Sequence, residues 1–161
     1  MNNTSMLQII VVTIGRCRNS ACEALAASYA CRLNKLAKIK IVELAGGRFA
    51  SGQASVARYN DSVKIAKFLD HYPGAHVYLL TELGKEFNSM EWANMLCHWD
   101  EAGQLVVLVI GGAPGLDNNV LKIKDTLSLS LLTWPHELAR VLLLEQLYRG
   151  LTIKAHKDYH Y

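Results

Sequence analysis

The chain of 161 residues has no apolar run long enough to cross a membrane. A spanning helix needs about 18 or more consecutive apolar residues, and no stretch reaches that length. The apolar run 7–14 is not preceded by basic residues or followed by a small-residue cleavage site, so no secretion signal is predicted. We therefore expect a cytoplasmic protein with no membrane partner.

Motifs for metal binding and disulfide formation are also missing. His136 and Glu137 begin an H-E-x-x-H pattern, but its fifth position is Arg140, whose guanidinium cannot bind zinc. His156 and His160 stand four apart with no third ligand nearby. The cysteines fit neither a zinc knuckle nor a disulfide framework and are predicted to be reduced thiols: Cys17, Cys22, Cys31 and Cys97. No metal site is predicted.

A glycine-rich turn, GGAPGLD at 111–117, follows the most strand-like run of the chain, LVVLVI at 105–110. It has neither G-x-G-x-x-G spacing nor a following G-K-[ST], which disfavours a dinucleotide fingerprint and a Walker A loop. A turn without side chains at the end of a strand still lets a ligand approach the backbone closely. The turn is therefore a candidate ligand site, the alternative being a tight turn with no ligand.

Acidic residues are scarce in the first part of the chain. Residues 1–70 hold ten of the seventeen Lys and Arg against four acids, whereas the remainder holds seven against ten. The asymmetry indicates either a basic face that meets phosphates or the solvated surface of helices.

Apolar strand-like runs alternate with helical patterns along the whole sequence. The expected strands are 7–12, 38–44, 76–80 and 105–110, and the expected helices are 19–37, 54–69 and one capped by Asn88 and Glu91. The run 105–110 has the composition of a central parallel strand that is covered on both faces. The alternation predicts a single α/β domain over 1–161, with three layers and a mostly parallel sheet.

A further helix is predicted after Pro135, within LSLSLLTWPHELARVLLLEQLYRG at 127–150. It is apolar on almost every side, so all of its sides must be covered. Because the sheet covers one side only, we expect a second copy of the chain on the other and a homodimer. The alternative is a central helix buried within the monomer. Arg140 is interpreted as a buried structural partner in preference to a phosphate contact.

The motifs VIGGAPGLD, LSLSLLTWPHELARVLLLEQLYRG and a terminal Tyr-His occur in this order, and together they resemble the RlmH family of SPOUT-class methyltransferases. The resemblance covers the whole chain. It implies a SPOUT-type α/β/α sandwich with a C-terminal trefoil knot, a homodimer and S-adenosylmethionine as methyl donor. The implied reaction is methylation at N3 of a pseudouridine in 23S ribosomal RNA of the large ribosomal subunit, with RNA and not DNA as the partner.

The resemblance also implies site residues. Those for the cofactor are Leu80, Gly111, Gly112, Ser130, Leu131, Leu132, Thr133, Trp134 and Pro135. Tyr159 and His160, delivered across the dimer interface, are the candidates for orienting the base or accepting its N3 proton. Trp134 stands where the family more often has Leu. The tail ends at Tyr161 without the family's terminal cation, which weakens the expected phosphate contacts. The alternatives are a ribosome- or RNA-binding protein without turnover and a methyltransferase acting on another RNA.

Overall fold

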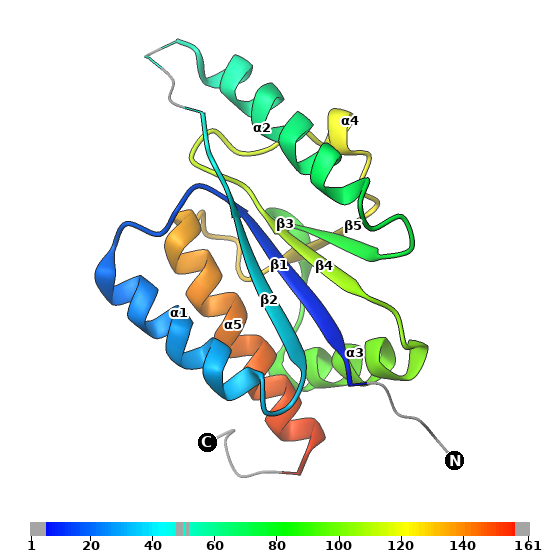
Figure 1. The fold of residues 1–161 in the computed structure, drawn as a ribbon. Coiled ribbons are helices and arrows are strands. Elements are labelled where there is room, and N and C mark those ends of the chain that lie inside the picture. The colour runs from blue at the N-terminus through cyan, green and yellow to red at the C-terminus, as the bar shows by residue number, and fades with distance from the viewer. Residues whose placement is uncertain (1–5, 48–49, 51, 157–161) are drawn as a thin grey trace.

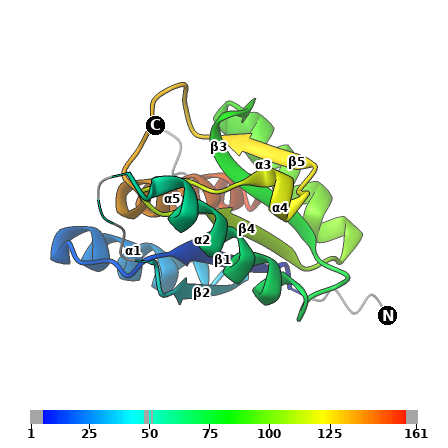
Figure 2. The ribbon, with the colours of Figure 1, turned by 90° about the horizontal axis from the view of Figure 1, so that it is seen from above.

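The computed structural model describes residues 6–47, 50 and 52–156. Five parallel strands form one sheet in the order β2-β1-β4-β3-β5, with helices on both faces (Figure 1; Figure 2). This architecture confirms the predicted α/β class and the parallel sheet. The elements are β1 (Gln8–Ile14), α1 (Ser20–Leu33), β2 (Lys38–Leu44), α2 (Ala54–Leu69), β3 (His76–Glu86), α3 (Ser89–Ala102), β4 (Val106–Ile110), α4 (Asn118–Leu121), β5 (Asp125–Ser128) and α5 (His136–Lys154).

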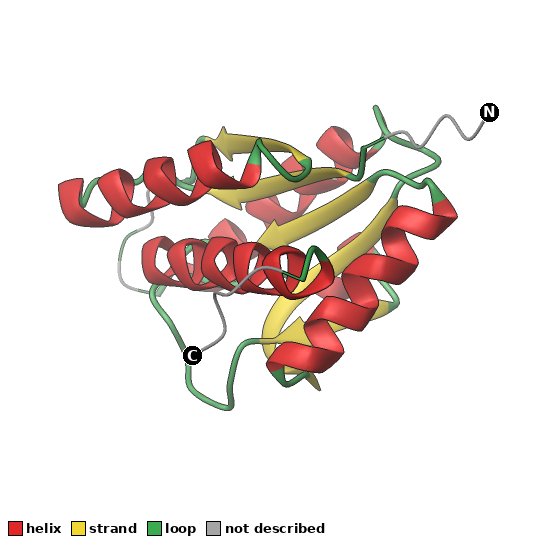
Figure 3. Cartoon of the chain, turned by 90° about the horizontal axis from the view of Figure 1, so that it is seen from below, coloured by secondary structure: helices red, strands yellow, loops and turns green. Residues whose placement is uncertain are grey.

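The two faces of the sheet bury separate apolar clusters. Alternate residues of the central strands, such as Val11 and Leu108, pack with α1, α3 and α5, and the intervening ones, such as Val12 and Val109, pack with α2 and α4. β4 is buried along its whole length, as predicted for a strand covered on both faces. The chain therefore has three layers, and Figure 3 views it from the side of α1, α3 and α5.

Most element boundaries follow local signals in the sequence. β2 and α2 have the predicted bounds, Asn19 caps α1, and Asn88 and Glu91 form the predicted capping box of α3. The prediction that the first helix extends to residue 37 was wrong, because α1 ends at Leu33. The side chain of Asn34 there accepts a hydrogen bond from the N–H of Ile39 (3.0 Å) and leads the chain into β2.

The apolar helix α5 lies between α1 and α3 and against β1 and β4 (Figure 1). Flanking helices thus cover much of the surface that the sheet leaves open, although Leu138 at the start of α5 is 40% exposed. The sequence analysis counted only the sheet as cover within the chain, but α1 and α3 also pack on this helix. The homodimer itself stays a prediction. Arg140 is buried on α5 and pairs with Glu43 of β2 at 2.5 Å, which confirms its structural interpretation.

The region of the Leu-Ser alternation contains a strand that the sequence analysis did not predict. β5 is four residues long and pairs only with β3, at one edge of the sheet. Both Leu80 and Lys85 of β3 pair with Leu127, so residues 81–84 bulge out between them. The short helix α4 was also not predicted. Threading of the C-terminal segment into a knot stays a prediction.

Among the residues that the structure describes, no helix combines the length and apolarity of a membrane span.

We predict that Gly84→Ala lowers the free energy of unfolding by about 1–3 kcal/mol, the usual effect of overpacking. A Cβ on Gly84 would lie 2.4 Å from the carbonyl carbon of Leu127, so β3 and β5 would have to separate. Urea denaturation measures the change. Gly74→Ala is the matched control, because a Cβ there meets nothing within 4 Å. Equal stability of the two variants would contradict the close approach of the strands.

Candidate cofactor site

The carboxyl ends of β4, β3 and β5 bring together the residues predicted to bind the cofactor. Leu80 ends the first part of β3, pairs with Leu127 of β5, and follows Leu79, which pairs with Val109 of β4. Gly111 and Gly112 follow β4 directly, and the loop 129–135 follows β5. Because adjacent parallel strands end at the same edge of the sheet, these three segments are neighbours.

The glycine turn after β4 leaves no room for side chains. A Cβ on Gly112 would lie 2.9 Å from Cγ2 of Ile14 at the end of β1, and a Cβ on Gly111 would lie 3.2 Å from Cγ of Leu116. Gly115 has a left-handed φ of +75°, and its N–H donates to the Gly112 carbonyl (2.9 Å). At its glycines the turn therefore presents backbone, not side chains, at this edge.

The loop between β5 and α5 is shaped by one serine. The hydroxyl of Ser130 accepts hydrogen bonds from the N–H of Leu132 (3.1 Å) and from the indole N–H of Trp134 (2.9 Å). Leu131 and Leu132 are nevertheless 78% and 64% exposed. The loop thus holds apolar side chains in a fixed turn without covering them, as a ligand or partner surface does.

The β1–α1 loop also reaches this edge, and the sequence analysis did not single it out. Gly15 has a φ of +95°, and a Cβ on it would lie 3.1 Å from Nε2 of His136, at the start of α5. That nitrogen is buried and has no hydrogen-bond partner among the described residues. A glycine directly after a strand was the one available signal, but it does not show that the loop packs against α5.

Two carboxylates fix the β1–α1 loop through its backbone. Glu43 accepts the N–H of Cys17 (3.1 Å) and the Arg140 ion pair on the same oxygen. Glu137 accepts the N–H of Arg18 (2.9 Å) and that of Asn19 (3.1 Å). Three successive N–H groups are therefore bound by acids from β2 and α5.

The pKa values of Glu137 and Cys17 both depart from their ordinary values. The hydrogen bond from the backbone N–H of Arg18 is the main reason that the pKa of the Glu137 carboxyl lies below its ordinary value, because it stabilises the charged form. Burial raises the pKa of the Cys17 thiol. Cys17 is therefore a neutral thiol at neutral pH, not an activated nucleophile.

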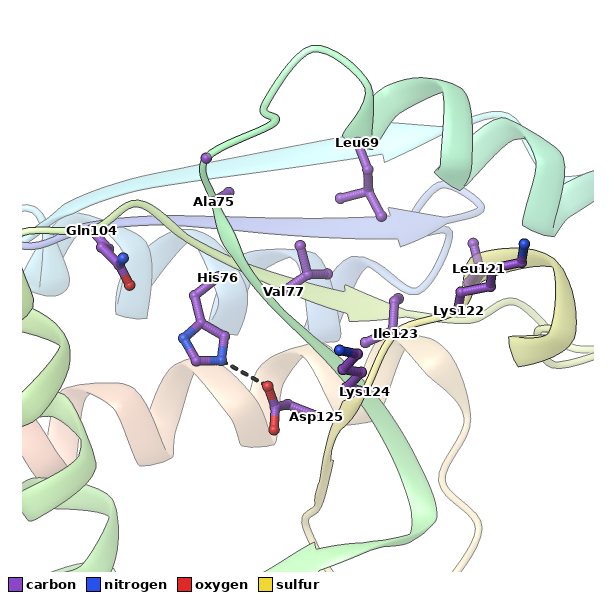
Figure 4. A pocket seen from close by; sticks show the side chains of 11 residues that line it. Leu69, Ala75, His76, Val77, Gln104, Leu121, Lys122, Ile123, Lys124 and Asp125 are labelled. Carbon is purple, nitrogen blue, oxygen red and sulfur yellow. Dashed lines mark hydrogen bonds and ion pairs between the residues drawn. The ribbon is translucent and has the colours of Figure 1, made fainter.

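A groove of about 430 Å³ lies at the opposite edge of the sheet, where β3 and β5 begin (Figure 4). His76 Nε2 lies 2.8 Å from Asp125 Oδ2 across it, and the His76 ring stacks on that of Tyr78. None of the predicted cofactor residues lines this groove. It is separate from the candidate site.

Tyr159 and His160 lie outside the described residues. Within the described part of the chain, no three His, Cys, Asp or Glu side chains are grouped so that they could hold a metal ion.

We predict that Glu137→Gln lowers the free energy of unfolding by about 1 kcal/mol at neutral pH, because a neutral amide accepts the two N–H groups less strongly. The pKa of Glu137 is depressed in the folded state, so its stabilisation is complete above the ordinary value of 4.5 and disappears as pH falls through the folded pKa. Urea titrations from pH 7 downward should show wild type and variant converging in acid. The control is Glu101→Gln, at an exposed carboxylate of α3, which should show no such convergence. If the stability difference between wild type and Glu137→Gln grew in acid, the hydrogen bonds assigned to Glu137 would be refuted.

Comparison with known proteins connects this geometry to a family. A family model described as "Predicted SPOUT methyltransferase" matches residues 7–160. A ribosomal RNA large subunit methyltransferase H from Gloeobacter violaceus is 38% identical over 157 residues, which cover 96% of this chain and 99% of the relative. The protein of the same name from Anaeromyxobacter sp. (strain Fw109-5) is 37% identical over 155 residues, with the same coverage.

Solved structures agree at the level of the fold. A probable methyltransferase from Bordetella pertussis Tohama I superposes with a TM-score of 0.51 at 15% identity, covering 92% of this chain and 95% of its own. The family model spans nearly the whole described sheet and its helices, and the relatives exceed 30% identity over almost their entire length. The chain therefore belongs to the SPOUT methyltransferase family.

Proposed function

We propose that this protein transfers a methyl group from S-adenosylmethionine to N3 of a pseudouridine in 23S ribosomal RNA, in the cytoplasm, where ribosomes are found. The observation that supports it is the convergence of Leu80, the glycine turn and the loop 129–135 at one edge of the sheet. Relatives that match the chain over almost their whole length have names that specify a large-subunit ribosomal RNA methyltransferase.

The residues at this edge fit the proposed cofactor. Adenosylmethionine has an apolar adenine and a polar amino-acid end, and backbone groups and apolar walls are sufficient to bind both. Gly111 and Gly112 leave backbone accessible, while Leu131, Leu132 and Trp134 provide partly exposed apolar surface beside them. In our proposal Ser130, Thr133 and Pro135 complete the pocket by fixing the loop.

The sulfonium of bound adenosylmethionine supplies an activated methyl group. The task of the protein is then to hold the target base in line with that methyl group and to receive the proton of N3. We assign the base-orienting and proton-accepting roles to Tyr159 and His160. No carboxylate dyad or metal is required for these steps.

The exposed apolar surface of the loop 129–135 supports a homodimer. Leu131, Leu132, Trp134 and the adjacent Leu138 of α5 are all partly or largely exposed on one monomer. A second copy would remove this surface from water and could bring its own tail to the site. The homodimer is thus proposed on the loop and on the exposed start of α5.

We predict that the protein transfers labelled methyl groups to large ribosomal subunits isolated from a strain that lacks this modification, with the label mapped to a pseudouridine by mass spectrometry. His160→Ala should reduce the rate by about 100-fold or more, the usual contribution of a general base. Its affinity for adenosylmethionine should change less than twofold.

The matched control is His156→Ala, at an exposed position of the same tail. This variant should retain the wild-type rate. Cofactor binding without label on any ribosomal particle would refute the proposed enzyme and favour an RNA-binding protein without turnover. Equal rates for His160→Ala and wild type would remove His160 from the mechanism.

A further inference from the structure

At the carboxyl edge of the sheet, two carboxylates are held by partners within the protein. The carboxylate of Glu43 is occupied by Arg140 and by a backbone N–H, and that of Glu137 by two backbone N–H groups. Their negative charge is therefore directed into the protein. Glu82, in the β3 bulge, is an exposed acid of the same edge.

Two arginines of the β1–α1 loop are not occupied in this way. Arg16 and Arg18 are both exposed, and neither guanidinium makes a hydrogen bond or ion pair with the described residues. Their backbone is not free, because Cys17, Arg18 and Asn19 donate to Glu43 and Glu137. A rigid loop thus presents two unpaired cations, which lowers the entropy lost when they bind an anion.

This loop borders the candidate cofactor site. Ile14, two residues before Arg16, lies against Gly112, and Gly15 lies against His136, which follows Pro135 of the cofactor loop. The two arginines therefore extend from a segment that contacts the glycine turn and the first residue of α5.

A third arginine lies on the other side of the glycine turn. The Nε of Arg58, on α2, donates to the carbonyl of Pro114 (2.8 Å), which holds the guanidinium over the turn. Ser62 fixes α2 there, since its hydroxyl donates to the Arg58 carbonyl (2.8 Å) and accepts the N–H of Asp117 (2.7 Å). The exposed Arg58 makes no ion pair with an acid among the described residues.

We infer that Arg16, Arg18 and Arg58 bind phosphates of the substrate RNA on both sides of the methyl-transfer site, and that Glu137 positions the first two by holding their loop. The inference rests on the proposed function for the identity of the anion. Guanidinium groups suit it, because each offers a planar set of donors that matches a phosphate.

The test compares binding of the full-length variants to unmodified large ribosomal subunits at fixed magnesium and rising potassium chloride. Each lost phosphate contact should lower the slope of log affinity against log salt by about 0.7–0.9. The double variant with Arg16→Ala and Arg18→Ala should therefore lower this slope by about 1.5 and weaken binding by about tenfold. Arg58→Ala should have roughly half of the effect on the slope.

Two controls separate this role from a structural one. Lys122→Ala with Lys124→Ala removes two exposed charges at the opposite edge and should change binding less than twofold. Replacement of Arg16 and Arg18 by Lys keeps the charge and should restore most of the salt dependence. Affinity for adenosylmethionine, measured by calorimetry, should be unchanged in the Arg16 and Arg18 variants, because these side chains are assigned to the RNA and not to the cofactor.

The inference would be overturned if the variant with Arg16→Ala and Arg18→Ala kept the wild-type affinity and salt dependence. It would also be overturned if the variant with Lys122→Ala and Lys124→Ala lost as much affinity as that variant. If wild type binds the particles but methylates none of their RNA, the proposed reaction fails while the comparison of variants still decides the role of the arginines. If wild type does not bind the particles, both proposals fail.

Discussion

The ion pair between Arg140 and Glu43 fixes the relation between the helical layer and the candidate site. Arg140 is 5% exposed in the N-terminal part of an apolar helix, and a buried guanidinium requires a charged partner. Its partner is at the end of β2, so α5 can pack only where this contact forms. The same Glu43 oxygen accepts the N–H of Cys17, which ties the β1–α1 loop to the pair. One contact thus sets the positions of a strand end, a loop and a helix.

The rest of the carboxyl edge depends on this arrangement. With α5 in place, Glu137 reaches Arg18 and Asn19, and His136 fills the space over Gly15. The start of α5 in turn determines where the loop 129–135 ends. Charged side chains therefore act here mainly on the backbone of the protein, while glycines, leucines and a serine form the surface proposed for the cofactor. This division fits a reaction whose driving force comes from the methyl donor.

The parts of the fold that were predicted are those with local signals. The strand 105–110 and helix 54–69 were found because their periodicity and composition depend on their own residues. The strand 125–128 was not found, because it is four residues long, lies at an edge and begins with an exposed aspartate. The cover that α5 receives within the chain was underestimated, because α1 and α3 pack on it from distant parts of the sequence. The apolar pattern of a helix does not indicate whether a sheet, a helix or a second copy covers it.

The residues of the site also differ in how far the sequence predicts them. Leu80, Gly111, Gly112 and Ser130 were predicted from the resemblance to a family, and they lie at one edge of the sheet. The contacts from Glu43 to Arg140 and from Glu137 to Arg18 join residues about a hundred positions apart, so no spacing rule indicates them. The arginines of the edge were visible only as an excess of basic charge before residue 70. Their exposure, and the occupation of the neighbouring acids, required coordinates.

The central claim is that the glycine turn and the loop before α5 form the cofactor site. Hydrogen–deuterium exchange of the full chain, with and without S-adenosylmethionine, tests it most directly. Peptides covering 111–116 and 129–135 should gain protection with the cofactor, and those covering 74–77 and 121–125, around the groove at the opposite edge, should not. Protection confined to the opposite edge would contradict the claim, and so would tight binding that left both predicted loops unchanged.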